Sequence, residues 1–396
     1  MTIPLLLLSF LARIIVPLLQ LLIVFKSKKA WKIESGNKGI FVFMAQHFLL
    51  SANARHLSLT QVVGLADAEI QALLKKARWG TEDEQVCPHC GVRHSAYFTN
   101  TRQQWQCKHC HTRFSITTGT IFQFHKLSLR QILIALYLFA TESTGLSAIS
   151  LSHKLNVQYK TAWVLLHKLR ESFNLTKDLT PLSGEIHSDG CYVNYYIRPK
   201  NFKHRRIDRR AKRNQRKDKA CVIVFRQRAT NQSIMKGADK SIVAMIKEEN
   251  GNDILALTHH LVKANSVICA DENAAYGLLN IHYRLERVNH SQEYCSIDGI
   301  TNNLVESFFA RFRRMMTGVH HRISNRYMMH YANETAWRED ERRKSEKEKF
   351  TQLLNKRLSC PPSRHFVGYW QGNKRPPATF GIASLSENAA DYHIAV

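Results

Sequence analysis

The chain has 396 residues, of which 44% are hydrophobic and 22% charged, a balance that indicates a folded globular protein with room for two or three domains. The 57 Lys and Arg residues outnumber the 31 Asp and Glu residues, and the formal charge of +26 favours a nucleic acid over a small-molecule substrate. Nine cysteines, four of them in two close pairs, suit one metal site in the reducing cytoplasm and argue against a disulfide framework. A basic protein of the ribosome is the plain alternative.

Residues 1–43 form an apolar leader. The stretch 3–25 is long enough to cross a membrane, but Arg13 and Pro17 interrupt it. A signal peptide fits poorly because no basic residue precedes the apolar run. At Met44 the composition becomes that of an ordinary soluble domain. We therefore expect a mis-set start codon and no membrane partner, with a membrane anchor or a signal as the alternatives.

Residues 44–80 are predicted to be a helical N-terminal segment, because apolar residues recur at helical spacing through 57–77. A zinc ribbon is predicted for 81–125, where two Cys-x-x-Cys pairs are separated by sixteen residues. The predicted zinc ligands are Cys87, Cys90, Cys107 and Cys110. Two such turns supply the four thiolates that structural Zn²⁺ prefers, whereas a single pair would equally suit redox chemistry. Four nearby histidines are expected not to bind the metal, namely His89, His94, His109 and His111.

Residues 126–175 are predicted to hold three helices. The second, 146–155, and the third, 159–173, are joined by a short turn, as in a helix-turn-helix that binds DNA. The third helix is predicted to place four basic residues outward, namely Lys160, His167, Lys168 and Arg170. A plain helical bundle is the alternative reading of this segment.

The second half begins with a predicted strand, 185–196, that carries Asp189 near its middle. Twelve of the next 22 residues, 198–219, are Lys or Arg, which indicates an arm that grips phosphates, or else a solvated loop. A β-branched strand is predicted at 221–228.

Further along, the pattern predicts a strand at 233–236 and a short helix at 239–248. A buried strand, 266–271, ends on Asp271, and residues 272–279 turn into helix. An amphipathic helix, 302–316, carries Glu306 beside apolar residues.

Three acids on two strands and a late helix can hold two Mg²⁺ (or Mn²⁺) ions, which is the arrangement used for in-line displacement at a phosphodiester. Asp189, Asp271 and Glu306 are therefore predicted to be the catalytic, metal-binding carboxylates of a ribonuclease-H-like α/β domain. Each acid alone is a weak signal, since Asp271 could close a turn and Glu306 could be a surface glutamate. Other candidates for the third position are Glu293, Asp298 and Asn303.

Several blocks of the sequence resemble bacterial insertion-sequence transposases of the DDE type that carry an N-terminal zinc ribbon. The matching blocks are MAQHFLLSANARHLSL, CPHCG with WQCKHCHTRFSITTGTIF, GEIHSDGCYVNYYIRPKN, ICADENAAYGLL, RVNHSQEY, DGITNNLVESFFARFRRMMTGVHHRIS and YANETAWRED. The likeness runs from Met44 to about Trp370, in one order. It supports Met44 as the start, and the leader 1–43 departs from the family pattern.

This resemblance implies a ribonuclease-H-like transposase domain over 183–340, preceded by the zinc ribbon and the helix-turn-helix-like region. It implies metal-dependent cleavage at the ends of an element and strand transfer into target DNA, with terminal inverted repeats bound by the front of the chain. A homo-oligomer is implied because two ends must be processed. A catalytically dead, transposase-derived DNA-binding regulator is the alternative.

Some residues in these blocks are open to two readings. His290, His320 and His321 could contact the scissile phosphate or merely bridge helices. Trp337 is expected to belong to the core rather than to stack on a base. The charged, proline-containing tail 341–396 is assigned no chemistry.

Overall fold

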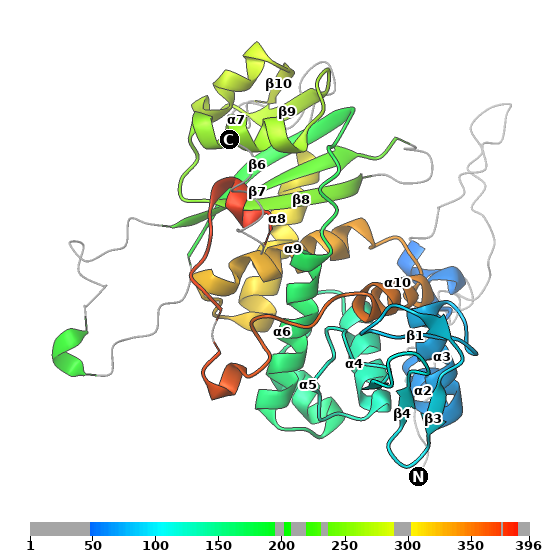
Figure 1. Ribbon diagram of the computed structural model, residues 1–396. Helices are drawn as coiled ribbons and strands as arrows, with labels where there is room; N and C mark the ends of the chain where they lie inside the picture. Colours follow the sequence, from blue (N-terminus) through cyan, green and yellow to red (C-terminus); the bar gives the residue numbers. More distant parts are fainter. Residues whose placement is uncertain are drawn as a thin grey trace, which may run out of the picture. The chain divides into compact units, whose positions relative to one another are not determined.

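The computed structural model describes residues 48–194, 202–206, 219–230, 237–288, 302–373 and 375–386 (Figure 1). The chain divides into two compact units, 1–51 and 52–396. In the first, the described residues form one short 3-10 turn, η1 (Phe48–Leu50), in which the Ser51 hydroxyl donates to the Phe48 carbonyl at 2.6 Å. The rest of this description concerns the second unit.

Several of the predictions fall outside the described residues. These are the leader 1–43, the strand at 233–236, most of the basic stretch 198–219, and the candidates Glu293, Asp298 and His290. Within the basic stretch, the structure describes a single 3-10 turn, η3 (Lys203–Arg205).

The second unit opens with η2 (Ala52–Arg55), α2 (Leu59–Gly64) and α3 (Asp67–Trp79), so the helices predicted within 57–77 are confirmed. Five short strands follow in the ribbon, namely β1 (Gln85–Val86), β2 (Arg93–His94), β3 (Tyr97–Thr99), β4 (Gln104–Gln106) and β5 (Arg113–Phe114). The indole of Trp105 lies between Trp79, at 5.2 Å, and Phe114, at 6.2 Å between ring centroids. These aromatic contacts fasten the ribbon to the end of α3.

Three helices come next, as predicted: α4 (Leu129–Thr141), α5 (Ala148–Leu155) and α6 (Tyr159–Leu175). Ser128 caps α4, and its side chain accepts from the Gln131 N–H at 3.2 Å. Asn156 ends α5 with a left-handed φ of 50°, which turns the chain sharply into α6.

The outward face predicted for α6 is wrong for three of its four basic residues. Lys160 is exposed, but His167, Lys168 and Arg170 are buried, at 2%, 5% and 2% of their full exposure. A helix from much later in the chain, α9 (Met328–Asp340), packs on this side of α6. Buried partners then replace water, and Arg170 Nε lies 2.6 Å from Glu334 Oε2 on α9.

The second half of the unit contains a five-stranded sheet in the order β10-β9-β6-β7-β8 (Figure 1). Its strands are β6 (Glu185–Val193), β7 (Ala220–Arg228), β8 (Ala238–Ile246), β9 (Val267–Asp271) and β10 (Arg284–Val288). The first three strands in sequence pair antiparallel, whereas β9 runs parallel to both β6 and β10. The centre of the sheet is therefore β6, the strand that carries Asp189.

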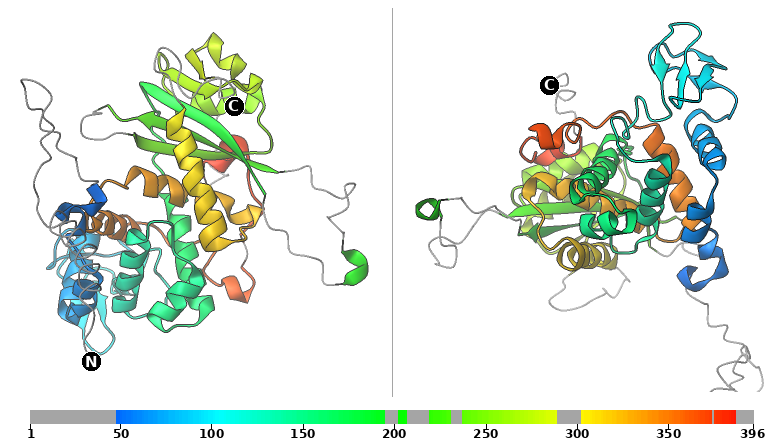
Figure 2. Two further views of the ribbon diagram at one scale, coloured as in Figure 1. Left: turned by 180° about the vertical axis from the view of Figure 1, so that it is seen from behind. Right: turned by 90° about the horizontal axis from the view of Figure 1, so that it is seen from below.

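Each face of the sheet has its own core. One face packs Ile186, Ile223 and Ile268 against the helix α7 (Gly251–Leu261) and the 3-10 helix η5 (Ala274–Ile281). The other packs Val222 and Val224 against α8 (Asn303–Met315), which crosses the strands in the left view of Figure 2, and against α9. Alternation along β6 assigns each of its side chains to one of these faces.

The short helix predicted at 239–248 is wrong, because this segment forms strand β8. Its residues Ile242, Val243 and Ile246 are β-branched, and they pair with strand β7, which is buried over 220–226. The helix of this region lies later, at α7, where the Asn250 side chain accepts from the Asp253 N–H at 2.9 Å.

The segment predicted as a tail contributes to the core. Within 341–396 the helix α10 (Glu346–Leu358) buries Phe350, Leu353 and Leu354 against α3 and α4. Short turns complete the chain: η6 (Met316–His320), η7 (Asn325–Tyr327), η8 (Tyr369–Gln371) and η9 (Gly381–Ser384). In the part of the chain that the structure describes, no helix is both long enough and apolar enough to span a bilayer.

Candidate metal centres

The two Cys-x-x-Cys turns of the ribbon have the same backbone geometry. In the first, the Gly91 N–H donates to the Cys87 carbonyl at 2.9 Å, and Gly91 has φ 73°. In the second, the His111 N–H donates to the Cys107 carbonyl at 3.1 Å, and His111 has φ 58°. The left-handed residue after each second cysteine bends the chain back, so that both thiols of each pair face inward.

The four thiols meet at the spacing that zinc requires. Cys87 Sγ lies 3.6 Å from Cys110 Sγ, and Cys90 Sγ lies 3.7 Å from Cys107 Sγ. A tetrahedron with Zn–S bonds of about 2.3 Å has sulfur atoms about 3.8 Å apart. All four sulfur atoms lie within 4.8 Å of one another, so these residues fit a structural zinc.

Groups around Cys107 favour its thiolate form. A backbone N–H from Cys110 is the largest influence that lowers the pKa of the Cys107 thiol to about 5, and His94 adds to it. His94 Nε2 lies 3.1 Å from Cys107 Sγ, so His94 acts as a neighbour of a metal ligand. The group of four cysteines is complete without His94.

Asp189 and Asp271 lie on neighbouring parallel strands at one end of the second sheet. The pairing sets Glu185 opposite Val267 and His187 opposite Cys269, so two residues further along, Asp189 reaches the level of Asp271. Side chains two apart on a strand share a face, which puts both aspartates on the α8 side, where Cys191 also packs.

Glu306 lies in the first turn of α8, the helix that covers this face. Its neighbour Val305 is buried, whereas Glu306 itself is exposed, so α8 turns the carboxylate away from its apolar side. Asn303, which competed with Glu306 in the sequence, is exposed at the very start of α8.

The carboxylates influence one another electrostatically. Burial is the largest of the influences that together raise the pKa of the Asp189 carboxyl to about 7. The charges of Asp271, Glu249 and Glu306 add to it, and a hydrogen bond from the Gly190 N–H opposes it. Such mutual repulsion is what a divalent cation would relieve. Among the described residues, Asp189, Asp271 and Glu306 do not form a group as tight as the cysteines. The ligands of two metal ions about 3.5–4 Å apart would lie further from one another than the ligands of a single zinc ion.

One acid of this cluster was missed in the sequence. Glu249 lies just before α7, and its Oε1 accepts from the Tyr276 hydroxyl at 3.1 Å. The sequence alone gives little reason to single out Glu249. Its position beside Asp189 depends on Gly190 and on helix α7, which the sequence pattern did not predict.

A second tight group of possible ligands is Glu185, His187 and Cys269, near the opposite end of β6 and β9. Glu185 Oε1 lies 2.9 Å from His187 Nε2 and 2.5 Å from Arg228 Nη1. Because the Arg228 guanidinium already neutralises this carboxylate, the group is a hydrogen-bonded ion pair rather than a metal site.

The remaining histidine and tryptophan candidates have structural partners. His320 packs on Tyr331, with ring centroids 4.6 Å apart, and burial lowers the pKa of its imidazole to about 3. Trp337 packs on Phe173 at 5.3 Å, so its predicted place in the core is confirmed. His321 is exposed, with φ 54°.

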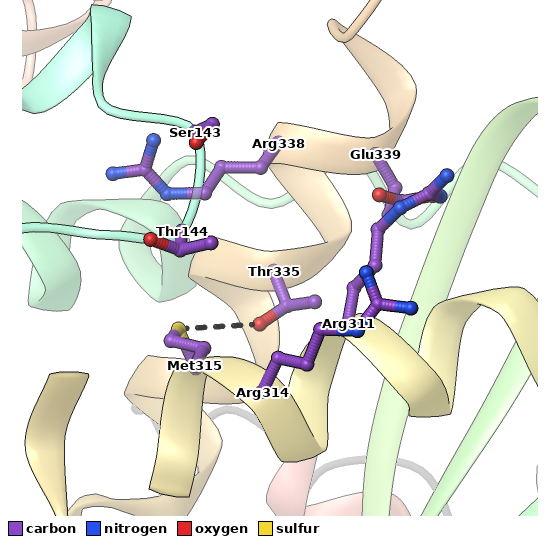
Figure 3. A pocket seen from close by; sticks show the side chains of 8 residues that line it. All are labelled: Ser143, Thr144, Arg311, Arg314, Met315, Thr335, Arg338 and Glu339. Atoms are coloured by element: carbon purple, nitrogen blue, oxygen red, sulfur yellow. Dashed lines mark hydrogen bonds and ion pairs between the residues drawn. The ribbon is translucent and has the colours of Figure 1, made fainter. Parts of the chain in front are cut away.

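A cavity of about 210 Å³ lies beside α8, where the loop after α4 meets α8 and α9 (Figure 3). Figure 3 shows the hydroxyls of Ser143 and Thr144 on one side and Arg314 on the other. Arg311 pairs with Glu339, whereas Arg314 is exposed. The lining therefore mixes polar and apolar groups, and Arg314 is its arginine that the structure leaves most open to solvent.

Comparison with known proteins supports both halves of this description. Residues 65–113 match a transposase zinc-ribbon domain, and residues 181–340 match an ISXO2-like transposase domain. The chain is also similar to an uncharacterized protein in transposable element ISH50 of Halobacterium salinarum, with 24% identity over 196 residues. That match covers 47% of this chain and 64% of the relative, so the chain spans less than two thirds of the relative's length.

No solved structure matches the chain. The two matched domains enclose the four cysteines and the three candidate carboxylates, respectively, in the order in which the sequence blocks occur. The chain therefore carries a transposase zinc-ribbon domain over 65–113, followed by an ISXO2-like transposase domain over 181–340.

Proposed function

We propose that this protein is an active DNA transposase, which cuts strands at the ends of its element and joins them to target DNA. The observation that carries the proposal is the placement of two aspartates level on adjacent parallel strands, on the face covered by the helix that bears Glu306. All three acids fall within the matched transposase domain.

The strand topology supports a ribonuclease-H-like domain. Three antiparallel strands, β6 to β8, are extended on the other side of β6 by two parallel strands, β9 and β10, with helices on both faces. In this architecture the central strand and its parallel neighbour bring their acids to one end of the sheet, as proposed for Asp189 and Asp271.

The proposed chemistry assigns each carboxylate a simple task. Bound Mg²⁺ or Mn²⁺ would activate the attacking hydroxyl and stabilise the leaving oxygen of an in-line displacement. Asp189, at the centre, would hold the cation site from the sheet, with Asp271 beside it. Glu306, on the exposed side of α8, would complete the site from the helix that covers this face of the sheet.

The zinc ribbon and the helix-turn-helix-like region would bind the terminal inverted repeats. The N-terminal turn of α6 is its accessible part, since Tyr159 and Lys160 are exposed while the later basic residues are buried. Recognition helices contact base edges with their N-terminal residues. Arg314 at the cavity beside α8 is placed to contact a backbone phosphate. A homo-oligomer would bring two such chains to the two ends of the element.

Cleavage of a duplex that carries the element's end tests this function. With Mg²⁺, the wild-type chain should nick the duplex, and Asp189→Ala should abolish nicking while it still binds the same DNA. Binding without cleavage by the wild type, at any divalent cation, would favour the catalytically dead regulator. Cleavage that survives Asp189→Ala would refute the assigned site.

A further inference from the structure

Glu249 lies where three parts of the sheet domain meet. It follows β8, it precedes α7, and its backbone N–H donates to the Tyr192 hydroxyl of β6 at 2.9 Å. Its carboxylate lies over the end of the sheet that holds Asp189 and Asp271. Nothing in the proposed three-carboxylate site accounts for an additional acid at this place.

The carboxylate of Glu249 occupies the space that a side chain on Gly190 would fill. A Cβ atom built on Gly190 would lie 2.3 Å from Glu249 Oε1, 2.7 Å from its Cδ and 2.9 Å from Cys221 Sγ. Because residue 190 has no side chain, the Glu249 carboxylate can lie against the backbone of β6, one residue from Asp189. Residues 189 and 190 face opposite sides of the sheet, so Glu249 approaches from the α7 side and Glu306 from the α8 side.

Asn273 connects Glu249 to Asp271. Its backbone N–H donates to Asp271 Oδ1 at 2.9 Å, and its side-chain amide donates to Glu249 Oε2 at 3.2 Å. One residue thus fixes the separation of the two carboxylates, as outer hydrogen bonds do around metal ligands.

The hydrogen-bond donors on the Glu249 side chain are neutral. They are the Tyr276 hydroxyl and the Asn273 amide. Across the described ranges, no Lys or Arg forms an ion pair with Glu249, although Glu185, Glu334 and Glu339 of the same half of the chain each have one. A half-buried carboxylate beside two other acids is costly unless a cation meets it.

From this geometry we infer that Glu249 is a fourth carboxylate of the catalytic metal site, which it reaches through the gap left by Gly190. The inference rests on the proposed function. A carboxylate there would hold a cation from the α7 side, directly or through a bound water, while Asp189 and Asp271 hold it from the strands. A purely structural Glu249 would only anchor the start of α7.

Metal dependence separates the two roles. Glu249→Gln keeps the shape of the side chain and removes its charge, and Glu248→Gln makes the same change at the exposed neighbouring residue. Mn²⁺ binding to the full chain, measured by calorimetry after the ribbon is loaded with zinc, should weaken about tenfold or more in Glu249→Gln and stay unchanged in Glu248→Gln. The Mg²⁺ concentration for half-maximal cleavage should rise by a similar factor.

Gly190→Ala provides a second variant, whose methyl group would also press on the buried Cys221 sulfur, so its folding is checked first. The added methyl group would displace the Glu249 carboxylate, so Mn²⁺ binding should weaken in the same direction. The double variant should bind Mn²⁺ no worse than Glu249→Gln, because both changes remove one interaction. If Glu249→Gln fails to fold, Gly190→Ala together with Glu249→Asp carries the test.

The outcomes test the role of Glu249 separately from the proposed transposase function. Mn²⁺ affinity in Glu249→Gln equal to that of Glu248→Gln, in a folded protein, would overturn the role of Glu249 and leave the transposase proposal intact. A wild type that binds Mn²⁺ through Glu249 but cleaves no end duplex would refute the function and leave the metal site standing.

Discussion

At the scale of single residues, the ribbon depends on four thiols whose charges need a metal. Cys107 receives hydrogen bonds from its own turn and from His94, which favour its thiolate form. A small domain with five two- or three-residue strands has little core of its own, so zinc supplies much of its folding free energy.

Replacement of one thiol should therefore empty the site. We expect Cys107→Ser to reduce zinc from about one ion per chain to nearly none, measured by elemental analysis of the purified protein. Cys360→Ala, at a buried cysteine outside the ribbon, is the control and should keep its zinc. A full zinc complement in Cys107→Ser would show that the four sulfur atoms are not the ligand shell.

At the scale of elements, a buried ion network joins α6 to α9. Burial alone would raise the pKa of the Glu334 carboxyl, but Arg170 and Arg338 lower it to about 2. Arg338 also donates to the Phe139 carbonyl at the end of α4, at 2.8 Å. Removal of one member of a buried pair leaves an uncompensated charge and is more costly than loss of a surface pair.

Glu334→Gln should thus lower the free energy of unfolding by about 3–5 kcal/mol in denaturant titrations. Glu142→Gln is the matched control, because Glu142 pairs with Lys154 on the surface and should contribute at most about 1 kcal/mol. An equal, small effect of the two changes would contradict the network.

The ion pair of Glu334 with Arg170 also predicts how the free energy of unfolding changes with pH. Because the folded pKa of Glu334 lies below its ordinary value of 4.5, its contribution is present above pH 4.5 and is lost as the pH falls toward about 2. The stability difference between wild type and Glu334→Gln should therefore shrink over that interval. A difference that stays constant down to pH 2 would be inconsistent with an ionised Glu334.

Elements also show where sequence reasoning succeeded and where it failed. The spacing of the cysteines and the acids at a strand centre and a strand end were legible, because they depend on local patterns. The strand β8 was mistaken for a helix, since its Ala244 and Met245 suit helices and only its pairing with β7 decides otherwise. Arg170 was expected outside because α9, which covers it, lies more than a hundred residues later.

Glu249 illustrates a different reason for failure. No spacing rule links an acid before a helix to a glycine about sixty residues earlier, and only the fold brings Glu249 against Gly190. Conversely, Glu306 was expected among apolar side chains, but α8 turns it outward. Such placements depend on tertiary contacts that hydrophobic periodicity does not encode.

At the scale of the whole molecule, the formal charge of +26 dominates the approach of DNA. A protein that neutralises many phosphates releases their counterions, so its affinity falls steeply as salt rises. We expect the affinity for end DNA to drop about 10³-fold or more between 50 and 200 mM salt, measured by fluorescence anisotropy. Affinity that is independent of salt would show that this charge does not face the DNA.

The central claim is that carboxylates far apart in the chain converge on one divalent-cation site at the end of the sheet. Anomalous scattering from Mn²⁺ in crystals of the protein with end DNA tests this most directly. We expect Mn²⁺ peaks between the carboxylates of Asp189, Asp271 and Glu306, within bonding distance of their oxygen atoms. Mn²⁺ bound elsewhere, with these carboxylates left without a cation, would contradict it.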